Sequence, residues 1–269
     1  MRIMYWNCTA PGGTSSNKFS DDKCKLIGEM ARAVNPDILV LDEVSATVFD
    51  NATATTFATS YINTANYSVV FGVSSVNPGV HLNCIVFTKP LQVKLGAQVG
   101  IPSDNWNTDG TIRDLARIQF SEPQTARTIN LWCLHANAST KGGKTAASLI
   151  AGGLKDSYSV YMGDLNCSPE DGEAALAISA PKAKVVRPAL GAYTFSQWRA
   201  DDSLGTVNIP GAVGKKVIPN AKGFIDYAMA APAMTVTAVN CLNGASDDTL
   251  RRIMSYGDHF PIAYDVKST

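Results

Sequence analysis

Short apolar runs recur along the whole chain, and this recurrence limits the fold more than any other feature of the sequence. Each run has the length of a strand that is buried on at least one face, whereas a helix needs about ten residues with a different apolar spacing. The sequence therefore predicts a protein built mainly from strands. The predicted strands are 3–6, 38–41, 67–71, 84–87, 116–120, 129–134, 159–162, 224–230 and 262–266.

Two stretches have helical spacing. One begins at Ser20-Asp21-Asp22, where acidic side chains suit the positive end of a helix, and ends at Asn35-Pro36. The other is predicted from about residue 144 to 155, after Gly142-Gly143. No internal repeat or low-complexity linker divides the chain, so residues 1–269 are predicted to form one domain. Many strands with few helices favour two facing sheets whose outer faces are covered by helices.

The composition is that of a globular protein, with 45% hydrophobic and 17% charged residues. Lys and Arg total 23 and Asp and Glu total 23, so the bulk charge that indicates a phosphate-rich partner is missing. A neutral protein can still carry a local basic surface and recruit metal cations. The net charge therefore neither indicates nor excludes nucleic acid as a partner.

No apolar run approaches the roughly 20 residues that cross a bilayer, and the first residues lack a signal-peptide core. The chain is therefore either cytosolic or a mature form whose leader was removed, which would make it secreted. Its six cysteines show no spacing typical of zinc sites. Free thiols are favoured, and a Cys8–Cys24 disulfide in an oxidising compartment is the alternative.

Polar residues stand where several predicted strands end. They are Asn7, Glu43, His135 and Asp164. Side chains at the ends of strands on a rigid scaffold commonly carry chemistry. This pattern predicts a site at one rim of the two sheets.

Six short segments carry a resemblance that covers nearly the whole chain. They are Tyr5-Trp6-Asn7, Leu41-Asp42-Glu43, Leu134-His135-Ala136-Asn137, Gly163-Asp164-Leu165-Asn166, Phe224-Ile225-Asp226-Tyr227 and Gly257-Asp258-His259-Phe260-Pro261. In this order the series resembles the endonuclease/exonuclease/phosphatase superfamily, and its details are most similar to the catalytic subunit of cytolethal distending toxins. The resemblance implies a deoxyribonuclease I-like fold, a four-layer α/β sandwich of two packed, mainly antiparallel sheets flanked by helices.

The resemblance also implies a role for each residue in phosphoester hydrolysis. Glu43 and Asp258 are expected to bind a metal, Mg²⁺ first with Mn²⁺ or Ca²⁺ as alternatives, because carboxylate oxygens suit these hard cations. His259 is the expected acid or base, with Asp226 orienting its ring. Asp164 is expected to position or deprotonate the attacking water. The expected phosphate contacts are Asn7, Arg113, His135 and Asn166.

Two positions next to these motifs depart from the family pattern. Ser45 stands where nucleases often carry an arginine, and Asp42 replaces a common glutamine. Because side chains alternate along a strand, Asp42 is expected to point away from Glu43 and to be structural. The segment 191–223 is predicted to be a long surface loop. Its aromatic and basic residues either grip nucleic acid or form a packed flap with a solvated rim.

Three functions are compatible with these residues. The first is a Mg²⁺-dependent endonuclease that cuts DNA and, as a toxin subunit, would associate with carrier subunits. The second is a phosphatase of the same fold that acts on phosphoinositides or another small phosphoester. The third is a non-catalytic binding or carrier module, which has no physical need for intact metal-binding and acid-base residues.

Overall fold

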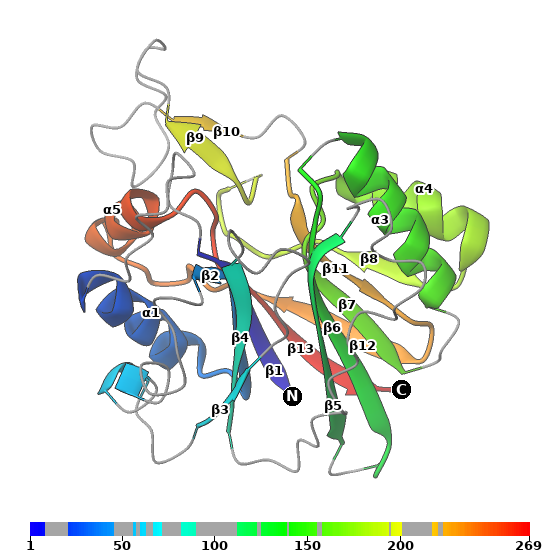
Figure 1. Cartoon of the computed structure of the whole chain (residues 1–269), viewed down its shortest axis with the longest axis horizontal. Coiled ribbons are helices and arrows are strands. Elements are labelled where there is room, and N and C mark those ends of the chain that lie inside the picture. The colour runs from blue at the N-terminus through cyan, green and yellow to red at the C-terminus, as the bar shows by residue number, and fades with distance from the viewer. Residues whose placement is uncertain are drawn as a thin grey trace.

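The computed structural model describes most of the chain. The described residues are 1–8, 21–45, 56–57, 60–62, 67–71, 82–89, 112–122, 125–138, 140–154, 158–193, 195–200, 217–219 and 223–269. Two mixed sheets are flanked by helices (Figure 1). The four described helices are α1 (Asp21–Val34), α3 (Thr140–Gly153), α4 (Pro169–Ser179) and α5 (Asp247–Tyr256). None of the described helices has the length and apolar character that a bilayer span requires.

The first sheet has the order β12-β13-β1-β2-β4-β3. Its strands are β12 (Met234–Val239), β13 (Ile262–Ser268), β1 (Arg2–Asn7), β2 (Ile38–Ser45), β4 (Leu82–Thr88) and β3 (Ser68–Phe71). Only β1 and β2 are parallel neighbours, and the other pairs are antiparallel. Helices α1 and α5 lie together on the outer side of this sheet (Figure 1).

The second sheet has the order β5-β6-β7-β11-β8, with α3 and α4 on its outer side (Figure 1). Its strands are β5 (Ile112–Ser121), β6 (Thr128–Ala136), β7 (Ser159–Asp164), β11 (Asp226–Ala230) and β8 (Lys184–Val186). Here β6 and β7 are the parallel pair. A separate two-stranded sheet pairs β9 (Trp198–Ala200) with β10 (Val217–Pro219).

The apolar faces of the two sheets pack against each other through β1 and β7 and through β4 and β5. Tyr5, Phe120, Tyr227 and Tyr264 are among the largest fully buried side chains. Burying an apolar side chain of this size contributes roughly 1.5–3 kcal/mol, so this interface is the main source of stability.

All nine predicted strands are present within a few residues of their expected ends, and α1 spans the predicted residues. The second predicted helix begins earlier, at Thr140, and Gly142 and Gly143 lie inside it. The described cysteines, Cys8 and Cys24 among them, are free and buried, as the first alternative predicted. Four strands (β8, β9, β10 and β12) and two helices (α4 and α5) were not predicted.

Part of the segment 191–223 is packed rather than a surface loop. Tyr193 and Phe195 are buried and lie against Phe260, with ring centroids 4.5 and 6.0 Å away. For these two side chains the packed alternative is therefore correct. The structure does not describe the remaining aromatic and basic side chains of the segment, although the backbone of Trp198 and Arg199 forms part of β9. These side chains are Trp198, Arg199, Lys215, Lys216 and Lys222.

Candidate active site

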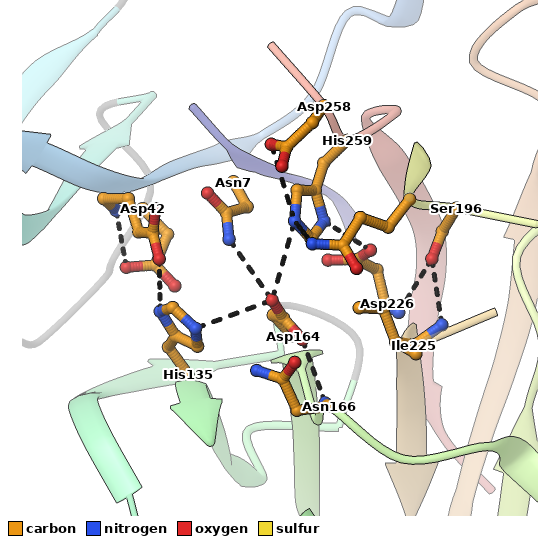
Figure 2. A network of polar contacts seen from close by, with 12 residues as sticks. Asn7, Asp42, His135, Asp164, Asn166, Ser196, Ile225, Asp226, Asp258 and His259 are labelled. Carbon is orange, nitrogen blue, oxygen red and sulfur yellow. Dashed lines mark hydrogen bonds and ion pairs between the residues drawn. The ribbon is translucent and has the colours of Figure 1, made fainter. Parts of the chain in front are cut away.

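The two parallel strand pairs place polar side chains at the same rim of the sandwich. Asn7 ends β1 opposite Asp42 of β2, and His135 near the end of β6 lies opposite Asp164, which ends β7. Because β1 and β7 face each other across the interface, the last side chains of the two sheets meet there. The Nδ2 atom of Asn7 donates to Oδ2 of Asp164 over 3.3 Å (Figure 2).

A bulge in β2 brings Glu43 into this group. The pairing of β2 with β4 shifts between Leu41 and Val44, and Glu43 has a φ of 55°, a left-handed conformation that is uncommon for residues other than glycine. Oε1 of Glu43 lies 3.0 Å from Nδ1 of His135. Strained backbone of this kind often occurs at functional sites, and here it directs a carboxylate inward.

The prediction that Asp42 points away from the site is wrong. Asp42 is 1% exposed, accepts a short hydrogen bond from the Tyr5 hydroxyl and accepts the backbone N–H of Glu43 over 2.8 Å. The bulge breaks the alternation of side chains, so both acidic residues reach the interior. The Tyr5 hydroxyl also accepts the backbone N–H of Asp164 over 3.2 Å, which ties the rims of the two sheets together.

Three nitrogen donors converge on one oxygen, Oδ2 of Asp164 (Figure 2). Besides Nδ2 of Asn7, they are Nε2 of His135 at 3.5 Å and Nε2 of His259 at 3.7 Å. These residues come from β1, β6, β7 and the segment before β13. The structure therefore brings widely separated parts of the sequence to a single point.

A second carboxylate orients His259. Oδ2 of Asp226, at the start of β11, lies 2.8 Å from Nδ1 of the ring, so Nε2 faces Asp164. The backbone N–H groups of Ile225 and Asp226 both donate to the buried Ser196 hydroxyl, over 2.9 and 3.0 Å. Gln197, next in the chain, places its Nε2 atom 2.9 Å from Nε2 of His259.

The loop after β7 forms a tight turn beneath the site. Asn166 has a φ of 51°, its backbone N–H donates to Oδ1 of Asp164 over 2.9 Å, and its Nδ2 donates to the Ala136 carbonyl over 2.9 Å. Gly143 of α3 packs so closely that a Cβ atom there would lie 2.5 Å from the Asn166 carbonyl oxygen. The helix and the turn therefore fix Asp164 and Asn166 together.

The site at this rim is not open to solvent at Asp164 and His259. Asp164 is 1% exposed and His259 is 2% exposed. The facing sheets direct these side chains at each other rather than into solvent. Substitutions at these positions therefore have to keep the side-chain volume if the fold is to remain intact.

Burial and neighbouring charges shift the pKa values of the site strongly. Burial and the nearby Asp226 raise the pKa of Asp164 to about 7. Burial opposes protonation of His135, but the charges of Asp164 and Glu43 outweigh it and raise the pKa to about 10. Burial likewise opposes protonation of His259, and Asp226 raises the pKa of this histidine well above its usual value. At neutral pH both histidines are therefore cationic donors, and Asp164 is near its titration point.

Several buried polar atoms of the site have no hydrogen-bond partner. Among the described residues they are Nδ1 of His135, Oδ1 of Asp226 and Oδ1 of Asp258. Although Nδ1 of His135 is close to Glu43, the contact lacks hydrogen-bond geometry. Unsatisfied buried atoms are costly, and their clustering at one place indicates a site for a cation, water or substrate.

Two sets of side chains could hold a metal ion. Asp164, Asp226 and His259 offer ligand atoms within 4.8 Å of one another. The alternative set is Glu43 and Asp258, whose carboxylates are close enough for the charge of Glu43 to raise the pKa of Asp258, after the larger effect of burial. The second set consists of oxygen ligands, as Mg²⁺ prefers, and includes an unpartnered carboxylate oxygen.

The structure does not place every predicted site residue. Arg113 falls in β5, but its side chain lies outside the described residues. In turn, sequence reasoning missed Tyr5, Gln197 and the buried Lys23. Only Lys23 left a signal, because it shares the helical spacing of Ile27, Met30 and Val34 and so lies on the buried face of α1.

The arrangement of two mixed sheets with flanking helices matches solved structures of endonuclease/exonuclease/phosphatase proteins. One protein of that family, from Bacteroides thetaiotaomicron, matches with a TM-score of 0.60 at 13% identity, over 99% of this chain and 97% of that chain. The predicted deoxyribonuclease I-like fold class is therefore confirmed.

Two further solved structures share the fold. A mannosyl-6-phosphatase from Bacteroides thetaiotaomicron has a TM-score of 0.61 at 12% identity, over 99% of both chains. TDP2 from D. rerio, complexed with a single strand DNA product, has a TM-score of 0.57 at 13% identity, over 100% of this chain and 99% of that chain. No family model matches the chain, and no curated protein matches it. At such identities the likeness shows the fold alone.

Proposed function

We propose that this protein is a divalent-metal-dependent phosphoesterase that cuts DNA as an endonuclease. The observation that carries the proposal is the convergence of Asn7, His135 and His259 on Oδ2 of Asp164. Donors arranged around one carboxylate can hold the oxygens of a phosphoryl group while the carboxylate handles the proton of the attacking water. The contributing residues come from β1 to the segment before β13, which supports one domain over residues 1–269.

In this mechanism Asp164 is the general base. Its pKa of about 7 lets it accept a proton from water near neutral pH without holding that proton too tightly. Its other oxygen, Oδ1, is held by the Asn166 backbone, so Oδ2 keeps a fixed direction. Asn166 and Asn7 then provide uncharged amides near the phosphate.

The two histidines supply positive charge and protons. Asp226 holds Nδ1 of His259, so the Nε2 proton points to the place where the phosphoryl oxygens lie in this proposal. The raised pKa makes His259 a donor in the resting state rather than a base. His135 faces the same place from the other side and stabilises the charge that develops in the transition state.

Glu43 and Asp258 would hold the metal, with Asn7 beside them. An ion held there, Mg²⁺ or alternatively Mn²⁺ or Ca²⁺, would neutralise charge on the phosphate and the leaving oxygen. The set Asp164, Asp226 and His259 is less suitable for this task because Asp226 and His259 already bond each other at 2.8 Å. We assign that set to proton handling.

DNA as the substrate is supported by the DNA product bound to the TDP2 neighbour, which has the same fold. The narrower resemblance to the toxin catalytic subunit, and with it the carrier subunits, rests on the sequence segments 135–139, 225–228 and 258–261. The second candidate is a phosphatase that acts on a phosphoinositide or another small phosphoester. It is supported by the mannosyl-6-phosphatase neighbour.

Nicking of supercoiled plasmid in Mg²⁺ tests the proposal. Wild-type protein is expected to nick the plasmid, and His259→Asn, which keeps most of the ring volume, is expected to lose this activity. EDTA should abolish it, and Mg²⁺ should restore it. Absence of nicking by the wild type, together with phosphate release from a phosphoinositide or a sugar phosphate, would replace the first candidate by the second. Absence of both activities would favour a binding module.

A further inference from the structure

A buried tyrosine hydroxyl joins the two sheets at the candidate active site. Tyr5, in β1 of the first sheet, is 1% exposed. Its hydroxyl donates to Oδ2 of Asp42 and accepts the backbone N–H of Asp164, which ends β7 of the second sheet, over 3.2 Å. Because a hydroxyl can donate and accept at the same time, both bonds form together.

The side chain of Asp42 extends this connection to Glu43. Oδ1 of Asp42 accepts the backbone N–H of Glu43 over 2.8 Å, while Oδ2 accepts the Tyr5 hydroxyl. A carboxylate offers two acceptor oxygens, whereas the glutamine that is common at this position in the family offers one. Tyr5 and Asp42 therefore form a continuous hydrogen-bonded bridge between the backbone of Glu43 and the backbone of Asp164.

The backbone departs from regular strand geometry at both ends of this bridge. Glu43 has a φ of 55°. Gly163, directly before Asp164, has a φ of 144°, and a Cβ atom there would lie 1.9 Å from the Leu134 carbonyl oxygen. Such conformations are costly and persist only where the surrounding structure holds them. The bridge thus connects two strained points that carry the proposed metal ligand and the proposed general base.

A second buried tyrosine shows what a structural hydroxyl does in this fold. Tyr264, in β13 of the first sheet, is as fully buried as Tyr5. Its hydroxyl donates to the Val186 carbonyl over 3.1 Å, in strand β8 of the second sheet. Strand β8 carries none of the candidate site residues. Tyr264 therefore joins the same two sheets as Tyr5 does, but away from the candidate site.

We propose that Tyr5 and Asp42 are positioning residues that hold Glu43 and Asp164 in a fixed relation across the two sheets. The inference rests on the proposed function, in which Glu43 binds the metal and Asp164 accepts the proton of the attacking water. Tyr5 and Asp42 act through these two residues and do not contact the reacting atoms. Loss of the bridge lets the base and the metal ligand shift relative to each other, which slows the chemical step more than it weakens substrate binding.

Cleavage kinetics in Mg²⁺, on plasmid or on the small phosphoester that wild type hydrolyses, test the proposal. Tyr5→Phe removes only the hydroxyl and should lower kcat about 10- to 100-fold, with KM within about twofold of wild type. Asp42→Asn keeps an acceptor for Glu43 and should also lower kcat. The double variant should lose no more than the weaker single variant, because both substitutions break the same bridge. Tyr264→Phe is the matched control and should keep the wild-type kcat.

Amide hydrogen exchange in EDTA gives a second readout that needs neither metal nor activity. In Tyr5→Phe the Asp164 amide loses its acceptor and should exchange at least about tenfold faster, relative to the other amides of β7, than in wild type. In Tyr264→Phe the relative exchange of Asp164 should be unchanged. A general loss of stability would speed exchange along the whole strand instead.

The outcomes separate this inference from the proposed function. If folded Tyr5→Phe keeps the wild-type kcat or the wild-type exchange at Asp164, the bridge has no positioning role and the proposed function stands. An equal loss of kcat in Tyr264→Phe, or losses that multiply in the double variant, would overturn the inference too. Where Tyr5→Phe does not fold, Asp42→Asn decides by the same kinetic criteria. If wild type cleaves neither plasmid nor a small phosphoester, the proposed function fails and the positioning role fails with it.

Discussion

Two buried carboxylates at opposite ends of the sandwich differ in their hydrogen-bond partners and in the direction of their pKa shifts. Glu122 lies just beyond β5, at the end where Ser121 pairs with Thr128, and Asp164 lies at the end where it pairs with His135. Glu122 is 8% exposed and accepts hydrogen bonds from the Ser268 backbone over 3.0 Å, the Thr125 hydroxyl over 2.6 Å and the Ser268 hydroxyl.

These hydrogen bonds decide the protonation of the two acids. Burial alone would raise the pKa of Glu122, but its hydroxyl and backbone donors outweigh burial and lower it. Burial and Asp226 instead raise the pKa of Asp164 to about 7. At one end of the sandwich, hydrogen bonds satisfy the buried Glu122 carboxylate, which stabilises the fold. The other end keeps carboxylate oxygens without partners, at a cost that only a ligand or a reaction explains.

The largest expected contrast between the two ends is in turnover. Asp164→Asn should lower plasmid nicking by about 1,000-fold or more, because the general base is lost while the side-chain volume is kept. Glu122→Gln should nick at the wild-type rate. The comparison of single-turnover rates in Mg²⁺ checks both. Equal rates for the two variants would contradict the functional division of the molecule.

A smaller loss is expected from the residue that orients His259. Asp226→Asn should lower turnover by roughly 100-fold, since an amide no longer stabilises the imidazolium or fixes which ring nitrogen faces Asp164. The acidic limb of the pH–rate profile should move to lower pH, because the charge of Asp226 helps to raise the pKa of the general base Asp164. The basic limb should also move to lower pH than in wild type, because His259 loses the charge that raises its pKa.

Nine of the described strands could be predicted from the sequence, because apolar runs of strand length leave a local pattern. The candidate site residues were expected from the resemblance of the six segments, and the parallel strand pairs place several of them side by side. The bulge at Glu43 could not be predicted, because its left-handed backbone depends on pairing with β4, far along the chain. The inward position of Asp42 follows from that bulge and was missed for the same reason.

Other elements were missed although a signal was present. Helix α4 begins with a capping box, in which Ser168 and Asp171 bond each other's backbone, followed by proline at the first helical position. Helix α5 is capped by Ser246 and has two acidic residues in its first turn. Strand β12 alternates polar and apolar residues at a sheet edge, where one face stays half-exposed. These elements have few buried residues, so the apolar runs used to find strands did not reveal them.

The next contrast is between the effects of Glu122 and Asp164 on the free energy of unfolding. Glu122→Ala should lower the free energy of unfolding by about 2–4 kcal/mol, because the Ser268 backbone and the Thr125 hydroxyl lose a buried acceptor. Asp164→Asn should cost less than this or stabilise the metal-free protein, since it removes a buried charge. Urea unfolding in EDTA measures both. A larger loss for Asp164→Asn would mean that Asp164 serves stability as Glu122 does.

The smallest effect expected is a difference in how stability depends on pH. The pKa of Asp164 is about 7 in the folded protein and about 3.9 in an unfolded chain, so between these values the folded state binds the extra proton. Stability from this group therefore falls as pH rises through the window. Glu122 has the opposite sign, because a lowered pKa gives stability that is present above about pH 4.3 and is lost only at lower pH.

Between pH 5 and 6.5, Asp164 changes the stability with pH and Glu122 does not. His135 contributes no slope there, because its raised pKa gives stability that is fully present below about 6.5 and is lost only as pH rises toward 10. In EDTA, Asp164→Asn should remove roughly 1–2 kcal/mol of pH dependence, a Tm difference of about 3 °C across the window. Glu122→Gln should keep the wild-type slope, because Glu122 is already ionised in both states. If Asp164→Asn also keeps it, the carboxylate at the rim is ionised in the resting protein and does not have the raised pKa that its role as general base requires.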